Sequence, residues 1–355
     1  MFSSILLVVL ILHQQPVTLP PEAGKSAWIE KAFLSLESGR YPRIAAVSWW
    51  HENFDRSMLR IDSSGAALAA YRAGVSSRTL VSGPRMQDGK LVAAEEGVYH
   101  AAFADLGGTE DRVDARRIHH FELLAGKPIT WVYFSNNWYE QIRFPINEVA
   151  QIHRMGKLAF IRMMPRSGFD QGGPDPLYGM QDIIDGLLDD ELILWADDAA
   201  ATGIPLLVEF GTEMNGDWFP WNGRYNGGAK SDAYGDPGLA DGPERFRDAY
   251  RHIIDICDAQ GADNITWFFH VDAYGAPQEA WNRMENYYPG DEYIDWLGVS
   301  VYGPQETGEA YREFSEILDD VYPRLRELAD KPIAVLEFAI TELGQRRALP
   351  TAPDW

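Results

Sequence analysis

The sequence predicts an α/β fold of the (β/α)8 TIM barrel type, and three observations carry the prediction. Eight short apolar runs follow one another along the 355 residues, helix-like segments separate them, and their spacing is even. Repeated β-α units build parallel sheets, and eight of them suit a closed barrel. Most runs are continuously apolar, which is typical of parallel strands covered on both faces. The expected strands are Ile44–Trp50, Val98–Ala104, Ile129–Phe134, Leu158–Met163, Pro205–Phe210, Ile265–His270, Ile294–Val301 and Ile333–Phe338.

Amphipathic segments fill the intervals between these strands and predict the outer helices. They are Ser26–Leu36, Asp111–Leu124, Ile146–Met155, Tyr178–Ala201, Glu244–Ala259 and Glu309–Ala329. A doubly wound sheet is the alternative arrangement, but no Gly-x-Gly-x-x-Gly follows any of the strands. Long loops with Gly, Pro and Asp occupy residues 167–176, 217–243 and 274–291. Barrel enzymes build their sites on loops that follow strands.

The amino-acid composition limits the kinds of binding partner that this chain can have. A 46% hydrophobic chain of this length can bury a sizeable core, and its formal net charge is -22. Because no Lys/Arg run interrupts this negative charge, we expect neither nucleic acid nor a membrane as partner. Neutral substrates fit better than anionic ones, and a monomer is expected. The single Cys257 excludes an intramolecular disulfide, and its place in an expected helix predicts a buried thiol.

The N-terminal segment leaves localisation open. Residues 5–12 form an apolar run that is too short to span a bilayer. No Lys or Arg precedes it and no clear small-x-small cleavage site follows, so it resembles a signal peptide only weakly. We divide the chain into residues 1–22, a signal-like segment or an irregular extension, and residues 23–355, a single barrel. Secretion or a periplasmic location is one alternative.

Two strand ends carry the chemistry. The run at residues 206–210 is soon followed by Glu213, and a Gly-rich loop with Trp218 and Trp221 comes directly after it. The last expected strand also ends in a carboxylate, Glu337. An acid that protonates a glycosidic oxygen, a second carboxylate and aromatic faces for pyranose rings are what glycoside hydrolysis needs. The alternative is that each Glu only pairs with an Arg.

The spacing between the two carboxylates decides the stereochemistry. Retention requires them about 5–5.5 Å apart, and inversion requires more room. Two like charges so close raise one pKa, which would keep Glu213 protonated while Glu337 attacks. Glu209 lies four residues earlier in its strand, so we expect it deeper in the barrel in a structural role.

Further substrate contacts are predicted at the same end of the barrel. Trp218 and Trp221 stand in a polar loop where core burial is difficult. Of Trp49 and Trp50 only one should reach the pocket, because successive strand residues face opposite sides. Polar residues at or near strand ends are further candidates, each with a hydrogen-bonded core role as the alternative: Asn215, Arg162, Tyr302, His270 and His100.

A metal centre is the remaining possibility among the histidines. His51, His100 and His270 come from three strands but show no ligand-spacing motif, so we predict no metal site. No cofactor is expected either, since acid–base hydrolysis of a glycoside does not require one.

Several of these segments resemble glycoside hydrolase family 26, the β-mannanase family. The similar motifs are residues 212–221 (TEMNGDWFPW), 129–135 (ITWVYFS), 287–299 (YYPGDEYIDWLGV) and the Glu337 strand, within a resemblance over most of residues 25–345. The resemblance implies a retaining (β/α)8 barrel with Glu213 as acid/base and Glu337 as nucleophile. It also implies that Tyr302 holds the nucleophile and that one of Trp49 and Trp50 floors the −1 subsite.

The order of the segments departs from the family. Residues 23–75 resemble its C-terminal part, namely helix 7, strand 8 and helix 8, while residues 97–355 resemble strands 1 to 7. The sequence therefore looks circularly permuted, with a linker at 76–96, and a fragment cut across two tandem barrels is the alternative. Compact domains tolerate such rearrangement because their termini are often close together. A second departure is Thr212, since family members often carry His there, which bears on the substrate more than on the reaction.

The sequence thus predicts a retaining endo-β-glycanase that acts on a neutral β-linked polysaccharide or oligosaccharide by double displacement. β-1,4-Mannan is the favoured substrate. The same chemistry on β-xylan or mixed-linkage β-glucan is one alternative, and a non-catalytic polysaccharide-binding barrel is another. Endo or exo action is left open.

Overall fold

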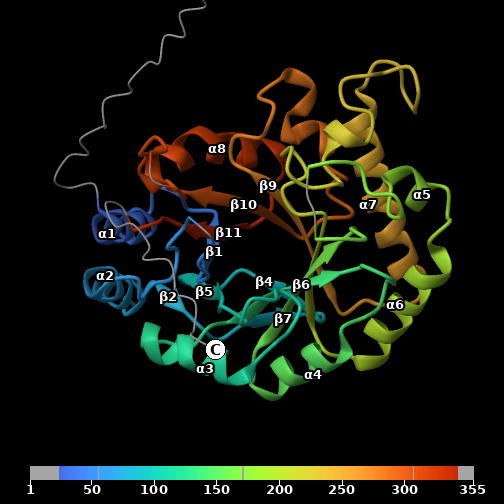
Figure 1. The fold of residues 1–355 in the computed structure, drawn as a ribbon. Coiled ribbons are helices and arrows are strands. Elements are labelled where there is room, and N and C mark those ends of the chain that lie inside the picture. Colours follow the sequence, from blue (N-terminus) through green and yellow to red (C-terminus); the bar gives the residue numbers. More distant parts are fainter. Residues whose placement is uncertain (1–23, 55, 170–171, 307, 343–355) are drawn as a thin grey trace, which may run out of the picture.

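Eight parallel strands close into one barrel in a computed structural model that describes residues 24–54, 56–169, 172–306 and 308–342 (Figure 1). The first of these strands pairs in parallel with both the second and the last, so the barrel closes within the chain. The (β/α)8 fold is therefore confirmed. The strands are β1 (Ile44–Trp50), β5 (Val98–Phe103), β6 (Trp131–Asn137), β7 (Leu158–Met164), β8 (Leu206–Phe210), β9 (Ile265–Asp272), β10 (Trp296–Tyr302) and β11 (Ile333–Ala339).

The helices surround the barrel (Figure 1). They are α1 (Lys25–Glu37), α2 (Gly65–Val75), α3 (Ala115–Ala125), α4 (Ile146–Arg154), α5 (Met180–Ile184), α6 (Asp189–Thr202), α7 (Asp241–Ala259) and α8 (Phe314–Leu328). The single helix expected at Tyr178–Ala201 is wrong: it is divided at Gly186, whose φ of +74° ends α5 before α6 begins. The last helix begins five residues later than expected, where Glu313 and Glu316 form a capping box.

The segment expected to be a linker has structure of its own. It contains β2 (Leu80–Val81) and a hairpin of β3 (Arg85–Gln87) with β4 (Lys90–Val92). Leu91 is buried, its N–H donates to Thr266 Oγ1 at 2.8 Å, and its carbonyl accepts from Trp296 Nε1 at 2.8 Å. Because Thr266 and Trp296 stand at the starts of β9 and β10, the hairpin covers the N-terminal end of the barrel.

Strand alternation separates the two tryptophans of β1. Trp49 points outward and packs edge-to-face on Tyr71 and Phe338, at centroid distances of 5.3 and 4.9 Å. Trp50 points inward and stacks on Phe103 at 4.2 Å with an interplanar angle of 6°. As expected, only one of the pair faces the barrel mouth.

Two remaining sequence predictions concern single segments. Cys257 is buried in α7, as expected, and burial raises the pKa of its thiol. The apolar run at residues 5–12 lies outside the described residues. Within the described part of the chain, no helix has the length and apolar character needed to cross a membrane.

Candidate active site

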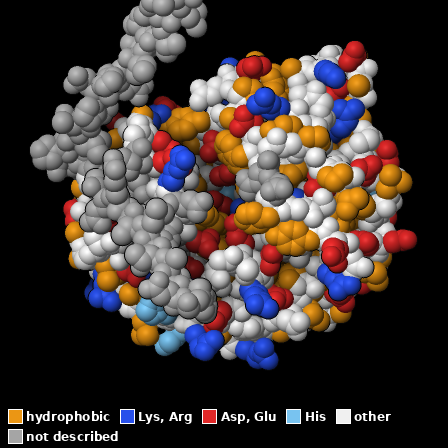
Figure 2. Space-filling model, in the orientation of Figure 1, with side chains coloured by type: hydrophobic (Ala, Val, Ile, Leu, Met, Phe, Trp, Pro, Cys, Tyr) orange, Lys and Arg blue, Asp and Glu red, His pale blue; other side chains and the backbone are white. Residues whose placement is uncertain are grey.

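The two predicted catalytic carboxylates line one cavity at the C-terminal ends of the strands. Glu337 lies on β11, and Glu213 follows β8 by three residues. The cavity has a volume of about 410 Å³ and also includes Trp50, Arg162, Trp218 and Tyr302. Figure 2 shows that one face of the molecule is hollowed near its centre, and acidic side chains lie in the hollow. This end of a (β/α)8 barrel is where its active sites are built.

The backbone at Glu213 is held in an unusual conformation. Its φ is +52°, in the left-handed region that residues with a Cβ rarely occupy. Its N–H donates to the His270 carbonyl at 3.1 Å, and its carbonyl accepts from Asn222 Nδ2 at 2.8 Å. Trp218 Nε1 donates to the carboxylate itself at 2.8 Å. Strain of this kind persists only where the surroundings enforce it, and it is common at functional sites.

The surroundings of Glu213 favour its protonated form. Burial is the main cause that raises the pKa of this carboxyl, and together with the negative charges of Glu337 and Asp272 it brings the pKa to about 8. Its side chain is almost fully enclosed, with the residue 8% exposed. At neutral pH Glu213 is therefore a proton donor.

The surroundings of Glu337 are rich in donors. Tyr302 donates its hydroxyl proton to Oε2 at 2.8 Å. Arg162 Nη2 lies 3.3 Å from Oε1, and the Tyr133 hydroxyl lies 3.2 Å from the same oxygen. A guanidinium and two phenols therefore hold this side chain in place at the cavity, where a carboxylate could act as a nucleophile.

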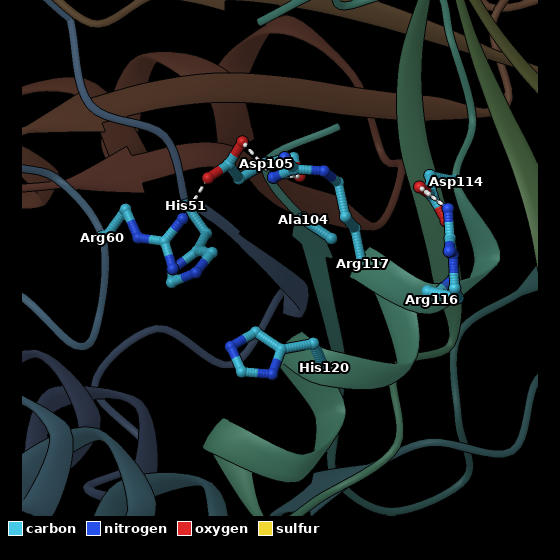
Figure 3. A pocket seen from close by; sticks show the side chains of 8 residues that line it. All are labelled: His51, Arg60, Ala104, Asp105, Asp114, Arg116, Arg117 and His120. Carbon is cyan, nitrogen blue, oxygen red and sulfur yellow. Dashed lines mark hydrogen bonds and ion pairs between the residues drawn. The ribbon is translucent and has the colours of Figure 1, made fainter. Parts of the chain in front are cut away.

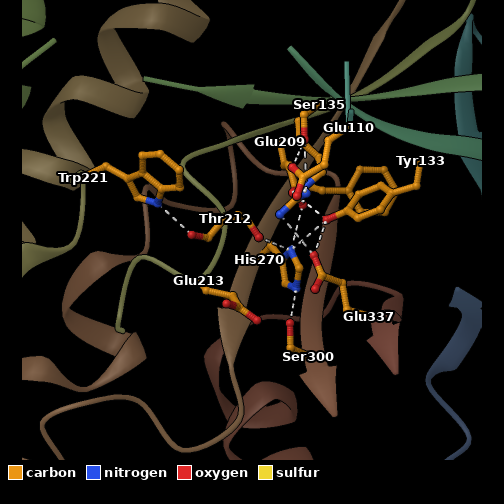
Figure 4. Close-up of polar contacts among 12 residues, drawn as sticks. Glu110, Tyr133, Ser135, Glu209, Thr212, Glu213, Trp221, His270, Ser300 and Glu337 are labelled. Carbon is orange, nitrogen blue, oxygen red and sulfur yellow. Dashed lines mark hydrogen bonds and ion pairs between the residues drawn. The ribbon is translucent and has the colours of Figure 1, made fainter. Parts of the chain in front are cut away.

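A buried polar network lies between and below the two carboxylates (Figure 4). His270 Nδ1 lies 2.9 Å from Glu209 Oε2 and 2.8 Å from Thr212 Oγ1, while Nε2 lies 2.9 Å from Ser300 Oγ. Burial alone would lower the pKa of His270, but the charge of Glu209 raises it above its usual value. Glu209 has the structural place predicted for it, paired with His270 and 2.6 Å from the Tyr133 hydroxyl.

Some predicted substrate contacts reach the cavity and others do not. Trp50, Trp218, Arg162 and Tyr302 line it. His270 lies below the carboxylates and is 1% exposed.

Four predicted contacts are not among the residues that line this cavity. Trp221 is fully buried, stacked on Phe219 at 4.4 Å, with Nε1 donating to the Thr212 carbonyl at 2.7 Å. Trp49 faces the helices, because strand side chains alternate. His100 is enclosed by Tyr71 and the Pro128 carbonyl. Asn215 instead joins the β8 loop to β9, exchanging hydrogen bonds of 2.8 Å with the backbone of Asp272.

The sequence reading missed several cavity residues. Glu110, Arg166 and Phe169 line the cavity, and Asn222 holds the backbone of Glu213. Glu110 stands in the irregular segment before α3, where no strand pattern marks it. Phe169 lies in the loop at residues 167–176 that the sequence did identify, and Arg166 directly precedes it. The position of both after strand β7 was the available signal.

A second cavity of about 470 Å³ lies beside α3 (Figure 3). Its arginines are paired with neighbouring carboxylates: Arg60 with Asp62 and Asp105, Arg117 with Asp105, and Arg116 with Asp114. His51 lines this cavity, so His51, His100 and His270 do not converge. In the described ranges, no cluster of three or more His, Cys, Asp or Glu side chains could hold a metal ion.

Fold and site together define a (β/α)8 barrel with two carboxylates of opposite surroundings at its mouth. Residues 179–344 match the model of glycosyl hydrolase family 26, and the chain is related to this family. This stretch contains both Glu213 and Glu337.

Two curated proteins with glycanase names are also similar to this chain. Endoglucanase H of Acetivibrio thermocellus is 26% identical over 234 residues, covering 65% of this chain and 23% of the relative. A mannan endo-1,4-beta-mannosidase of Caldalkalibacillus mannanilyticus is 26% identical over 162 residues, 45% of this chain and 25% of the relative. The chain thus spans about a quarter of the length of these curated relatives. Among solved structures, a β-mannanase from a symbiotic protist of the termite Reticulitermes speratus gives a TM-score of 0.46 at 14% identity, covering 81% of this chain and 80% of that one.

Proposed function

We propose that this protein is a retaining endo-β-glycanase that hydrolyses a neutral β-linked polysaccharide, with β-1,4-mannan as the favoured substrate. One observation carries the proposal: Glu213 and Glu337 line the same cavity in opposite surroundings. Burial and like charge keep Glu213 protonated, while Arg162 and Tyr302 contact and fix the side chain of Glu337. Carboxyl groups with separated protonation states are the requirement for acid and nucleophile in glycoside hydrolysis.

The reaction follows in two displacements. Glu213 gives its proton to the glycosidic oxygen while Glu337 forms a bond to the anomeric carbon, and the bond to the leaving sugar breaks. Glu213, now a carboxylate, takes a proton from water, and the hydroxide attacks the anomeric carbon of the glycosyl-enzyme. Glu337 leaves and the starting protonation states return. Trp218 fixes the Glu213 carboxyl, so it orients the proton for transfer.

Two kinds of observation support a neutral polysaccharide as substrate. The matched relatives carry the names endoglucanase and mannan endo-1,4-beta-mannosidase. Acidic side chains outnumber basic ones in the cavity lining, which disfavours anionic sugars. The same chemistry on β-xylan or mixed-linkage β-glucan is the second candidate. A non-catalytic binding barrel is less well supported, because binding alone requires neither the protonated Glu213 nor a second carboxyl group in the same cavity.

We also propose that the barrel is circularly permuted. Glu213 follows the fifth barrel strand and Glu337 lies on the eighth. In the family that the sequence resembles, the two acids follow strands 4 and 7, so both are displaced by one strand. A rearranged chain that begins at residue 76, and so keeps the β3–β4 hairpin, and that carries residues 24–75 after residue 342 should fold and keep activity. Loss of folding in that chain would favour the fragment of tandem barrels instead.

The activity itself is tested by a hydrolysis screen over β-1,4-mannan, β-xylan and mixed-linkage β-glucan. Proton NMR of the first product should show the β-anomer before mutarotation, because two displacements retain configuration. If the α-anomer appears first, the enzyme inverts the configuration and the proposal of a retaining mechanism is wrong. Binding to mannan without hydrolysis of any of the three would favour the binding barrel.

A further inference from the structure

Arg166 is a buried cation with two uncommitted donors in the wall of the active-site cavity. The residue is 1% exposed, yet within the described ranges Nη1 and Nη2 have no hydrogen-bond partner. Nε donates to Asn137 Oδ1. A buried guanidinium that lacks acceptors loses its hydration without compensation, which is costly unless a ligand supplies oxygen atoms.

The neighbours of Arg166 hold its side chain in place but do not satisfy the hydrogen-bonding capacity of Nη1 and Nη2. Asn137 is itself fixed, since its Nδ2 donates to Asp111 Oδ1 at 2.6 Å. Glu110 Oε2 lies 3.8 Å from Nη2, within ion-pair range but beyond a hydrogen bond. Tyr139 also lies beside Arg166, and burial raises the pKa of its phenol while the guanidinium lowers it. Nε is therefore anchored, while Nη1 and Nη2 are buried without a hydrogen-bond acceptor among the described residues.

Phe169 completes this part of the wall. Its ring lies 4.8 Å from the guanidinium carbon of Arg166 and is 63% exposed. One face thus shields the cation from water, while the rest of this large apolar side chain stays open at the cavity. An exposed aromatic ring beside fixed donors and an acceptor is the usual composition of a sugar site, because a sugar offers apolar C–H faces and hydroxyl edges.

We propose that Arg166, Glu110 and Phe169 form a subsite for one neutral sugar residue of the glycan, outside the carboxylate pair. Arg166 donates to two adjacent hydroxyl oxygens, and Glu110 accepts a hydroxyl proton. The proposal rests on the proposed function for its substrate class, although binding at this subsite does not require cleavage.

The charges around the subsite select a neutral sugar over a uronate. Besides Glu110, Asp111 reaches Arg166 through Asn137, and Glu52 lies near Glu110. Burial and the charge of Glu110 raise the pKa of Glu52 to about 7, so the region already disfavours one more negative charge. A sugar carboxylate would add repulsion that hydroxyl groups avoid.

Calorimetric titration with neutral oligosaccharides of two to six units tests the subsite. The protein is the full chain with Glu337→Ala, so that ligands stay intact. Arg166→Met should weaken binding by about tenfold to a hundredfold, because two hydrogen bonds to a charged group are lost. The loss should appear only for oligosaccharides long enough to fill the subsite. Arg166→Lys should recover part of it, since an ammonium cannot match the fork of two nitrogens.

Two further variants keep the test decisive. Phe169→Ala removes an exposed ring, so it should fold even if Arg166→Met does not, and it should weaken the same long ligands several-fold. Arg116→Met is the matched control: Arg116 lies on α3 with its side chain 93% exposed, and binding should not change. Equal binding by Phe169→Ala, or a loss that is the same at every ligand length, would overturn the proposal.

Failure of the proposed function would look different. If the parent hydrolyses no β-glycan but the length-dependent loss persists, the subsite stands and the hydrolase does not. If the parent hydrolyses mannan while Arg166→Met and Phe169→Ala bind every length as the Glu337→Ala parent does, the hydrolase stands and the subsite does not. Tighter binding of an acidic oligouronide than of a neutral one would overturn the selection of a neutral sugar.

Discussion

The two ends of the barrel differ in how their polar groups are used. At the N-terminal end, the β3–β4 hairpin meets the strand starts with matched partners: Leu91 with Thr266 and Trp296, and Lys90 with Asp295 at 3.0 Å. At the C-terminal end, Glu213 is strained and protonated, and Arg166 keeps two donors without partners among the described residues. The difference indicates that one end stabilises the fold, while the other holds groups that are favourable only with a ligand. Substitutions at the two ends should therefore have opposite signatures.

Glu337→Ala at the C-terminal end should have the largest effect. Without the nucleophile, kcat should fall by about 10⁴- to 10⁶-fold, while the melting temperature should change little. Steady-state kinetics on the best polysaccharide, with circular dichroism on the same samples, measures both. A variant that keeps the kcat of the parent would show that Glu337 is not the nucleophile.

Glu213→Ala should have the next largest effect, and it should depend on the leaving group. Loss of the acid should slow polysaccharide hydrolysis by roughly 10²- to 10⁴-fold. An aryl glycoside with a good leaving group needs little protonation, so its first step should survive. Azide should then release the intermediate as a β-glycosyl azide, because a small anion needs no general base. An α-glycosyl azide, or equal losses on both substrates, would contradict these roles.

Leu91→Ala at the N-terminal end should show the opposite signature. Truncating this buried side chain should lower the free energy of unfolding by about 2–5 kcal/mol, while kcat and KM stay as in the parent. Urea denaturation and the polysaccharide assay measure the two quantities. A large loss of kcat in a folded variant would remove the distinction between the two ends.

Glu213→Gln should change how stability depends on pH, which is the smallest effect. The folded pKa of about 8 exceeds the usual 4.5, so between these values the folded state binds more protons than the unfolded state. The parent therefore loses stability as pH rises through this window, on the order of 1 kcal/mol per pH unit, and the amide variant lacks this loss. Urea unfolding at pH 5, 6.5 and 8 should show a growing advantage of Glu213→Gln. Glu52 titrates in both proteins, so it cancels in the difference; a constant difference would mean that Glu213 is not protonated near neutral pH.

The sequence predicted the barrel, and the end of it at which Glu213 and Glu337 lie, because local pattern determines both. Continuous apolar runs specify buried parallel strands, and a carboxylate just after such a run must lie at the barrel mouth. The direction of single side chains was harder to predict. Trp221 stands in a polar loop yet packs on Phe219, because the loop folds back under Glu213.

Contacts between segments that are distant along the chain could not be predicted from the sequence. Glu110 meets Arg162 and Ser135 only once β6 and β7 lie side by side. The lack of hydrogen-bond acceptors for Nη1 and Nη2 of Arg166 can be recognised only when the burial of this side chain is known. For the same reason, the sequence predicted a linker where the structure has a hairpin at residues 85–92. The few apolar residues of this hairpin can be explained only by the strand starts that it covers.

The positive φ of Glu213 has a consequence for protein engineering. Glycine or asparagine would occupy this backbone position with less strain, and neither would introduce a buried ionisable group. A library selected for heat resistance alone should therefore drift at position 213 toward these residues and become inactive while it becomes more robust. Thermostabilisation of this barrel needs a screen that scores turnover at every round, with position 213 held fixed.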